Sequence, residues 1–310
     1  MPIRSTAIGT QTKPQVVAIT PRLLLAYASG LGECHPPYFD DAAATGIVGH
    51  PAFCVVLEWP VTLMLREAES LGISGEEKTR GVQAAQDSIF HRPIRPGDRL
   101  RTVASLVQIR RIRPGAFVLT KFETVDDRTD APVVTSYASS IYRGVEVEGE
   151  DAWIEDAPSL PAVCQNVAAL TQIPIPIARE APHVYTECAQ IWNPIHTERQ
   201  VALQAGLPDI ILHGTATWAL AAGHLIRHCA QADPTRLRRF IGRFTAMVIP
   251  GSTITLEYRE PEGDTVAYSV YNTEGEPAIS QGIAVLGEPQ VAAHGVRGDV
   301  DAPPVSRCAV

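Results

Sequence analysis

The feature that most constrains this chain is a weak internal repeat, in which the second half follows the first in the same order. Each copy opens on a tyrosine, Tyr27 or Tyr185. The residues at equal distances from these tyrosines pair as Glu33 with Ile191, His35 with Asn193, and Pro36 with Pro194. Self-similarity of this kind indicates two copies of one structural unit.

Each copy continues with a histidine-containing segment and then a long, mainly apolar stretch. In the first copy residues 48–53 precede an apolar stretch from Cys54 to Leu71, and in the second residues 211–216 precede an Ala-rich stretch that ends at Ala230. The length and composition of both stretches favour buried helices. Pro60 is expected near the first turns of its helix or at a kink.

A Pro-Gly turn and three strand-like segments follow in each copy. The turns are residues 95–98 and 249–252, and residues 126–130 and 272–276 are credible hairpin turns. The predicted strands are residues 100–110, 115–125 and 133–142 in the first copy, and 253–259, 265–272 and 279–286 in the second.

Each copy therefore predicts an α+β unit, in which one antiparallel sheet wraps around one long central helix. We assign residues 1–156 to the first unit and residues 178–290 to the second. The Pro-rich residues 157–177 are expected to link them, and residues 291–310 are expected to form a poorly packed tail.

Composition argues against several functional classes. Hydrophobic residues make up 45% of the 310, which is ample material for a core. The net charge of −8 argues against a nucleic-acid partner. We expect neither a membrane span nor a signal peptide, because no apolar run is long enough. The six cysteines lack short paired spacings, so we expect a cytoplasmic protein without a bound metal.

The segment Asn193-Pro194-Ile195-His196, followed by His213-Gly214, resembles the MaoC-like (R)-specific enoyl-CoA hydratases. That family has a tyrosine, then Ser-Gly-Asp-x-Asn-Pro-x-His, then a His-Gly pair that opens the central helix. The resemblance extends over residues 8–290 and implies a tandem, or double, hotdog fold. It also implies reversible addition of water to the α,β double bond of a CoA or carrier-protein thioester, with no separate cofactor.

The resemblance assigns acid–base chemistry to His196 and an orienting role to Asn193. Imidazole titrates near neutral pH, which suits proton transfer. Gly214 is expected to begin the long helix, where a free backbone N–H can polarise the thioester oxygen. Ile191 and His213 are expected to contact the substrate.

The main departure from the family is at the catalytic Asp, whose position is occupied by Ile191. His196 could act with water and a carboxylate of the substrate itself, which would favour a dicarboxylic acyl group. The chemistry could instead be lost, which would leave a thioester-binding protein. A third explanation is that another acid reaches the site after folding, the candidates being Glu187, Glu198 and Asp209.

The first copy carries the complementary remnants of the motif. Glu33 stands where the family has Asp, His35 follows it, and Tyr38 takes the position of the catalytic His. We expect this copy to be a degenerate half that shapes the acyl pocket. A second polar site formed by Glu33, His35 and Tyr38 is the alternative.

Two further features are candidates for substrate binding. An arginine cluster that ends at Arg243 could meet the CoA phosphates, although a solvated surface explains it equally well. Trp192 could line the acyl pocket, although a buried aromatic residue is more often part of the core. The cluster consists of Arg236, Arg238, Arg239 and Arg243.

The sequence thus predicts a hydratase or dehydratase that acts on an acyl-CoA or acyl-carrier thioester with a short, branched or dicarboxylic acyl group. A hotdog thioesterase or an acyl-CoA-binding protein is the alternative. The sequence is also compatible with a homodimer of double hotdogs.

Overall fold

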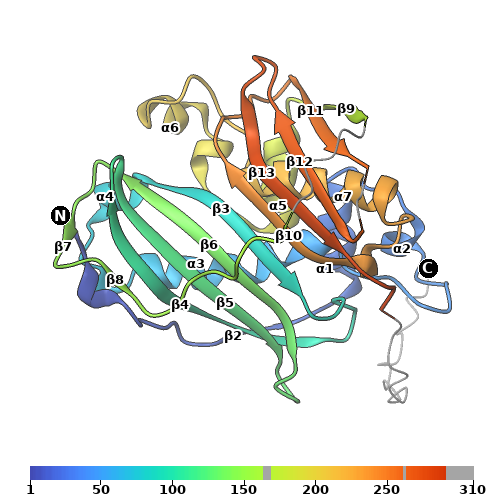
Figure 1. Cartoon of the computed structure of the whole chain (residues 1–310), viewed down its shortest axis with the longest axis horizontal. Coiled ribbons are helices and arrows are strands. Elements are labelled where there is room, and N and C mark those ends of the chain that lie inside the picture. The colour runs from blue at the N-terminus through green and yellow to red at the C-terminus, as the bar shows by residue number, and fades with distance from the viewer. Residues whose placement is uncertain (163–168, 261–262, 291–310) are drawn as a thin grey trace, which may run out of the picture.

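The computed structural model describes residues 1–162, 169–260 and 263–290, so the predicted tail lies outside the described residues. One continuous sheet of 11 strands dominates it (Figure 1). The strands lie in the order β2-β4-β5-β6-β3-β10-β13-β12-β11-β9, with β8 beside β4. Their bounds are β2 Gln15–Ala18, β3 Gly81–Phe90, β4 Arg99–Ile112, β5 Gly115–Asp126, β6 Pro132–Arg143, β8 Ala152–Trp153, β9 Leu170–Pro176, β10 Leu237–Phe244, β11 Thr253–Arg259, β12 Thr265–Tyr271 and β13 Pro277–Leu286.

The two long helices α3 and α7 lie behind the sheet in the view of Figure 1, with the shorter helices around them. Two short strands, β1 (Ile3–Arg4) and β7 (Val147–Glu148), pair with each other apart from the main sheet. The helices are α1 Pro21–Gly30, α2 Pro36–Phe39, α3 Cys54–Arg66, α4 Gly75–Thr79, α5 Ala181–Ala189, α6 Arg199–Gln204 and α7 Gly214–Cys229. No helix of the described chain is long and apolar enough to span a membrane.

The strand order is symmetric about the pair β3 and β10, which joins the two copies. These strands are antiparallel, with Arg239 opposite Ile89 and Arg243 opposite Ala85. Across this junction the guanidinium of Arg239 donates two hydrogen bonds to the carboxylate of Asp87, at 2.8 and 2.7 Å. A bidentate pair of this kind fixes geometry as well as charge, so it locks the register between the copies.

The same symmetry brings together the two tyrosines that open the repeats. Their hydroxyl oxygens lie 3.4 Å apart, and both side chains are buried. The Tyr27 hydroxyl donates to the carbonyl of Ala52 at 2.9 Å, and the Tyr185 hydroxyl donates to Oγ1 of Thr215 at 3.2 Å. Each tyrosine therefore ties its short helix to the start of a long helix.

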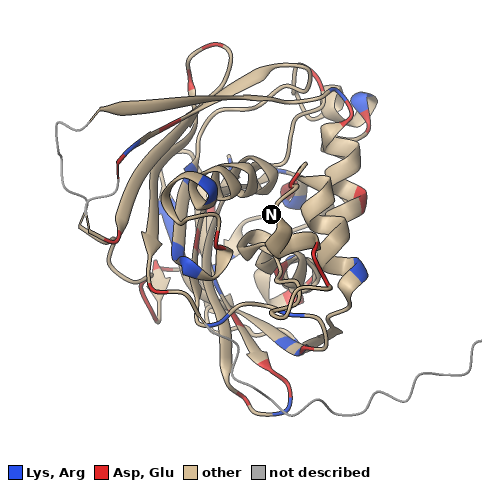
Figure 2. Ribbon diagram, turned by 90° about the vertical axis from the view of Figure 1, so that its right-hand side faces the viewer, with Lys and Arg blue, Asp and Glu red and all other residues tan. Residues whose placement is uncertain are grey.

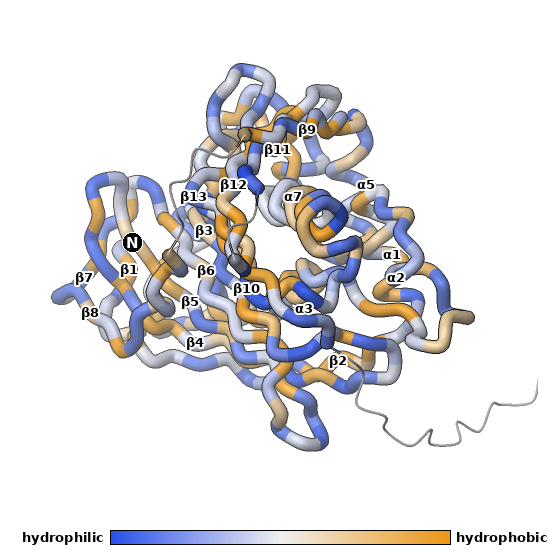
Figure 3. The backbone as a smooth tube through the Cα atoms, turned by 45° about the vertical axis from the view of Figure 1, so that its right-hand side comes forward, coloured by the Kyte–Doolittle hydropathy of each residue, from blue (hydrophilic) through white to orange (hydrophobic). Residues whose placement is uncertain are grey.

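The predicted α+β architecture is confirmed, with one difference: the two antiparallel sheets are joined edge to edge. Buried and less buried positions alternate along strands such as β11, and Figure 3 shows hydrophobic and hydrophilic residues interspersed along the strands. The hairpin at residues 126–130 closes on the bond from the Asp126 N–H to the Ala131 carbonyl. Pro60 lies in the middle of α3 and not in its first turns.

Seven of the described strands were not predicted, of which β1, β2, β7 and β8 are short and three are longer. Residues 170–176, placed in the linker, form β9, which pairs with β11 just as β2 pairs with β4. The other two, β3 and β10, follow the long helices and lie at the centre of the sheet. Residues 170–176 therefore join the sheet of the second unit, while residues 163–168 of the predicted linker lie outside the described chain.

The contact between α1 and α5 leaves no room for a side chain at Gly30. A Cβ built there would lie 2.6 Å from the Cβ of Cys188. Substituting Gly30→Ala should lower the free energy of unfolding by about 1–3 kcal/mol, although alanine is the better helix former. Denaturant unfolding measures this, with Gly75→Ala as the control, because a Cβ at Gly75 meets nothing within 4 Å. A Gly30→Ala variant as stable as the original would contradict tight packing here.

Candidate active site

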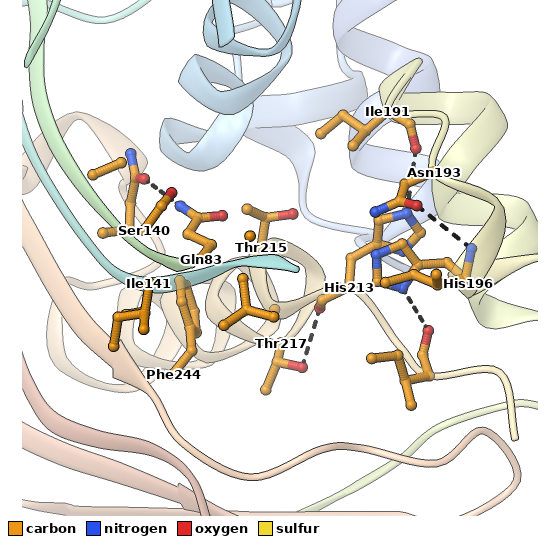
Figure 4. Close-up of a pocket in the computed structure, with 18 of the residues that line it drawn as sticks. Gln83, Ser140, Ile141, Ile191, Asn193, His196, His213, Thr215, Thr217 and Phe244 are labelled. Atoms are coloured by element: carbon orange, nitrogen blue, oxygen red, sulfur yellow. Dashed lines mark hydrogen bonds between the residues drawn. The ribbon is translucent and has the colours of Figure 1, made fainter. Parts of the chain in front are cut away.

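A cavity of about 420 Å³ lies between the two copies. The first copy lines it with one face of α3 and with residues of β3, β5 and β6. The second copy contributes the segment after α5, the start of α7, and residues 244–248, which end β10 and follow it. In the close-up of Figure 4, Gln83 and Ser140 of the first copy lie on one side and the two histidines of the second on the other. Neither copy alone could form this cavity.

The backbone after α5 carries His196 into the cavity. Helix α5 ends at Ala189, and the left-handed conformation of the next residue, Gln190 (φ 56°), turns the chain. Asn193 then caps a short 3-10 helix, because its side-chain oxygen accepts a bond from the N–H of Ile195. Pro194 occupies the first position of that helix, where its fixed φ suits a helix start. The Asn-Pro pair thus holds His196, the third residue of the turn, in place.

The hydrogen bonds of His196 define its tautomer. Its Nδ1 lies 2.8 Å from the carbonyl oxygen of Ile211. A carbonyl only accepts, so Nδ1 carries the proton and Nε2 has a free lone pair. Burial lowers the pKa of His196 to about 4, against a smaller opposing effect of the bond to Ile211. At neutral pH the ring is therefore an uncharged base.

His213 stacks on His196, with ring centroids 3.6 Å apart and planes inclined by 24°. Its Nε2 lies 3.3 Å from the Ile191 carbonyl oxygen and 3.3 Å from the Thr186 hydroxyl. Burial and, to a smaller extent, the neighbouring His196 together lower the pKa of His213 to about 2. Both stacked imidazoles therefore stay uncharged at neutral pH and line the same side of the cavity.

Helix α7 begins at Gly214, directly beside these rings. The first amides that bond within the helix belong to Ala216 and Thr217, which both donate to the carbonyl of His213. The N–H groups of Gly214 and Thr215 precede them and lie at the positive end of the helix dipole. The cavity therefore offers backbone donors for a developing negative charge.

Ile191 is buried and lines the cavity, so an aliphatic side chain stands where the family places its acid. None of the three acids suggested as substitutes lines the cavity. Glu187 lies 3.4 Å from the indole nitrogen of Trp192, Asp209 pairs with Arg199 at 3.3 Å, and Glu198 is exposed. The prediction that one of them takes the place of the Asp is not supported.

Trp192 and Arg243, both predicted to contact the substrate, lie outside the cavity lining. The Trp192 side chain is 57% exposed and lies outside the cavity lining, because its indole N–H points toward Glu187 on α5. Arg243 lies in β10 at the sheet centre, and its side chain does not line the cavity either. Of the same cluster, Arg239 is used in the ion pair with Asp87.

The polar residues of the first copy do come together, but away from this cavity. The buried carboxylate of Glu33 lies 3.1 Å from Nδ1 of His35 and 3.3 Å from the guanidinium of Arg227 on α7. A Cβ at Gly223 would lie 2.0 Å from its other oxygen, so this carboxylate rests directly on α7. Tyr38 is buried nearby, with its ring centroid 5.4 Å from that of His50 and the two planes inclined by 37°. His50 is the counterpart of His213.

Several cavity residues escaped the sequence analysis because they belong to the copy that was expected to be degenerate. On α3 they recur at helical spacing: Val55, Glu58, Trp59, Thr62 and Arg66. The signal was available, since a glutamate in a mainly apolar helix is unusual unless it has a partner. Glu58 is the sole carboxyl side chain among the residues that line this cavity.

Charge gives no further guide to the ligand. Figure 2 shows both signs of charge interspersed over the molecule. Among the described residues there is also no group of three His, Cys, Asp or Glu side chains arranged to hold a metal ion.

Comparison with known proteins identifies each copy separately. Residues 166–280 match the model of the MaoC-like domain, and residues 6–136 match the FAS1-like dehydratase domain region. A probable enoyl-CoA hydratase 2 of Dictyostelium discoideum is 26% identical over 179 residues, which are 56% of this chain and 58% of that protein. Enoyl-CoA hydratase ChsH3 of Mycobacterium tuberculosis is 24% identical over 55% of this chain and 63% of its own length. The matches thus span less than two thirds of these curated relatives.

Solved structures extend the likeness to the whole chain. A MaoC-like dehydratase from Phytophthora capsici has a TM-score of 0.80 at 18% identity, covering 93% of this chain and 98% of that one. A conserved hypothetical protein of Mycobacterium tuberculosis, described as a double hotdog, has a TM-score of 0.60 at 16% identity, covering 90% and 96%. The chain belongs to the MaoC-like dehydratase and hydratase 2 family and has its double hotdog fold.

Proposed function

We propose that the protein is a hydro-lyase that adds water to, or removes it from, the α,β double bond of an acyl thioester, with CoA or a carrier protein as the thiol. The observation that carries the proposal is the tautomer of His196. Its Nδ1–H is fixed on the Ile211 carbonyl, so the lone pair of Nε2 is left as a base in the cavity beside the free amides of α7.

The proposed step uses these groups together. With the thioester carbonyl at the Gly214 N–H, Nε2 of His196 takes a proton from water while the water oxygen bonds to the β-carbon. The electrons of the double bond move to the thioester oxygen, where the helix amides stabilise the negative charge. The imidazolium then returns its proton to the α-carbon. Since Ile191 cannot move protons, one imidazole performs both transfers.

The acyl group is proposed to occupy the groove between α3 and the sheet of the first copy. Val55 and Arg66, the first and last cavity residues of α3, lie roughly 16 Å apart along the helix axis at 1.5 Å per residue. A four-carbon acyl group is much shorter, at about 1.5 Å per bond. The groove therefore favours a longer chain than the short or branched acyl group that we expected, whereas a dicarboxylic one would still fit beside Arg66.

A second candidate follows from Ile191. Without a carboxylate beside His196, the cavity could bind an acyl thioester without hydrating it, or hydrolyse it as a hotdog thioesterase does. The two candidates differ in product, since hydration removes the absorbance of the conjugated double bond and hydrolysis releases a free thiol. We retain the cytoplasm as the proposed location.

Substituting His196→Ala should lower the rate of hydration of an enoyl-CoA by about 10²–10⁴-fold, because it removes the only base proposed for proton transfer. The affinity for a saturated acyl-CoA should change by less than about threefold, since the thioester is held by backbone amides. Loss of double-bond absorbance and calorimetric titration measure the two. His183→Ala is the control, because that ring is exposed and its Nε2–H donates to the Thr197 carbonyl, away from the cavity lining. Undiminished hydration by His196→Ala would rule out the assigned role.

The dependence of kcat/KM on pH gives an independent test. Since burial lowers the pKa of His196 to about 4, the neutral base persists as the pH falls and is lost only below that value. The acid limb should therefore have an apparent pKa near 4 rather than the usual 6.5 of imidazole. Circular dichroism at each pH confirms that the protein is folded. An acid limb near 6.5 would show that the ring is solvated in the working enzyme.

A further inference from the structure

The groove proposed for the acyl chain has two ends of different chemistry. The hydroxyl oxygens of Tyr27 and Tyr185 lie 3.4 Å apart. Tyr27 donates to the Ala52 carbonyl just before α3, and Tyr185 donates to Thr215 in the first turn of α7, so the two long helices start close together. The reacting groups therefore lie at the start of α3. Arg66, in the last turn of α3, lines the cavity at the opposite end.

The guanidinium of Arg66 lies between the helix and the sheet. Its central carbon is 5.5 Å from the centre of the Trp59 ring, which belongs to the same helix and also lines the cavity. On the sheet side it faces Tyr142 of β6. Burial raises the pKa of the Tyr142 hydroxyl, and the charge and hydrogen bonding of Arg66 oppose that rise. These two neighbours hold the guanidinium at the end of the groove.

A second arginine lines the cavity at the same end. Arg143 follows Tyr142 at the end of β6 and lies opposite Gly115 of β5. Two neighbours of these positions, Gly81 opposite Tyr142 and Pro114 next to Gly115, line the cavity as well. The far end of the groove is therefore its cationic end.

Neither arginine has an acidic partner. Among the described residues, no ion pair joins Arg66 or Arg143 to a carboxylate. The sole carboxyl side chain of the cavity lining, Glu58, bonds to Gln86, and burial raises its pKa, which disfavours its charged form. An arginine in the last turn of a helix complements the helix dipole, but it does so equally well in solvent. Two cations without counter-charges at one end of a cavity favour an anionic ligand, since guanidinium groups match carboxylate and phosphate.

We infer that the acyl chain of the substrate ends in a carboxylate, which binds the guanidinium of Arg66 at the far end of the groove. This inference rests on the proposed function and adds the substrate class, a thioester whose acyl chain carries a carboxylate at its far end. That carboxylate is remote from Ile191, so it does not replace the missing acid beside His196. The CoA phosphates are the other anionic oxygens of such a substrate, and binding measurements separate the two.

A carboxylate at this end and a methyl group are expected to differ strongly in binding. The planar guanidinium can donate two parallel hydrogen bonds to a carboxylate. A methyl group makes no such bonds and takes hydration from the guanidinium. An apolar groove end would reverse the preference, because a carboxylate would then lose its hydration without gaining a partner.

Binding of saturated thioesters tests the inference without turnover. Each pair of acyl-CoA thioesters shares one chain length and differs only at the far end, which is a carboxylate or a methyl group. Lengths from about six to about fourteen carbons bracket the groove at about 1.5 Å per bond. We expect the carboxylate-ended member of at least one pair to bind about tenfold more tightly by calorimetry. If the pairs bind but no length shows this preference, the inference is overturned while the proposed function stands. If no thioester binds, both fail.

Substitutions assign the preference to Arg66. Arg66→Gln removes the charge and should bring the affinity for the carboxylate-ended member down to that for its methyl-ended partner or below. Arg66→Lys keeps the charge without the planar fork and should retain more of the preference than Arg66→Gln. Arg99→Gln is the matched control, since that arginine pairs with Asp127 and lies outside the cavity lining. Circular dichroism checks that each variant is folded. An unchanged preference in Arg66→Gln would contradict the inference.

Thioesters of N-acetylcysteamine identify the source of the anionic group, because they carry the same acyl chains without a phosphate. The preference for a carboxylate end, and its loss in Arg66→Gln, should persist in this series. If Arg66→Gln instead weakens both members of each CoA pair equally and neither member of the N-acetylcysteamine pairs, Arg66 binds a CoA phosphate. That result would also overturn the inference.

Discussion

The pairing of β3 with β10 is the contact on which the rest of the molecule depends. It turns two copies of one unit into a single sheet, and the bidentate bond between Arg239 and Asp87 fixes how the copies are aligned. Because the copies face each other across this junction, the cavity is built from both. A change in the register of β3 against β10 would shift the first copy relative to the second. The groove residues of α3 and β3 would then lie differently relative to the imidazole of His196.

The junction also allowed the two copies to specialise. The second supplies the short turn with Asn193 and His196 and the open end of α7, which are the groups proposed to act on the thioester. The first keeps the same fold but supplies the walls of the groove through α3 and β3. The first copy therefore lacks the catalytic motif, but polar side chains on its other elements line the cavity.

How far the sequence predicts the structure depends on how directly each pattern reports burial. The strand at residues 253–259 was predicted to the residue, because its alternating side chains face core and solvent in turn. Strand β3 was missed because its buried positions include Gln86, Asp87 and Ser88, whose burial depends on partners that the sequence does not show. Strand β10 was read as a basic cluster for a similar reason, since the partner of Arg239 lies in the other copy. The motif did bring Asn193, His196 and Gly214 to one cavity. The sequence signal for Glu58 was a glutamate in a mainly apolar helix, but its place in the cavity follows only from the packing of α3 against the sheet.

The ion pair between Glu33 and Arg227 has a consequence for stoichiometry. A duplicated hotdog begins with two equivalent half-sites, and each could in principle serve one ligand. In the first copy the carboxylate of Glu33 pairs with Arg227 and His35 and lies against the backbone of α7 at Gly223. It therefore connects the two halves as a structural contact, and the proposed function leaves one ligand position in each chain.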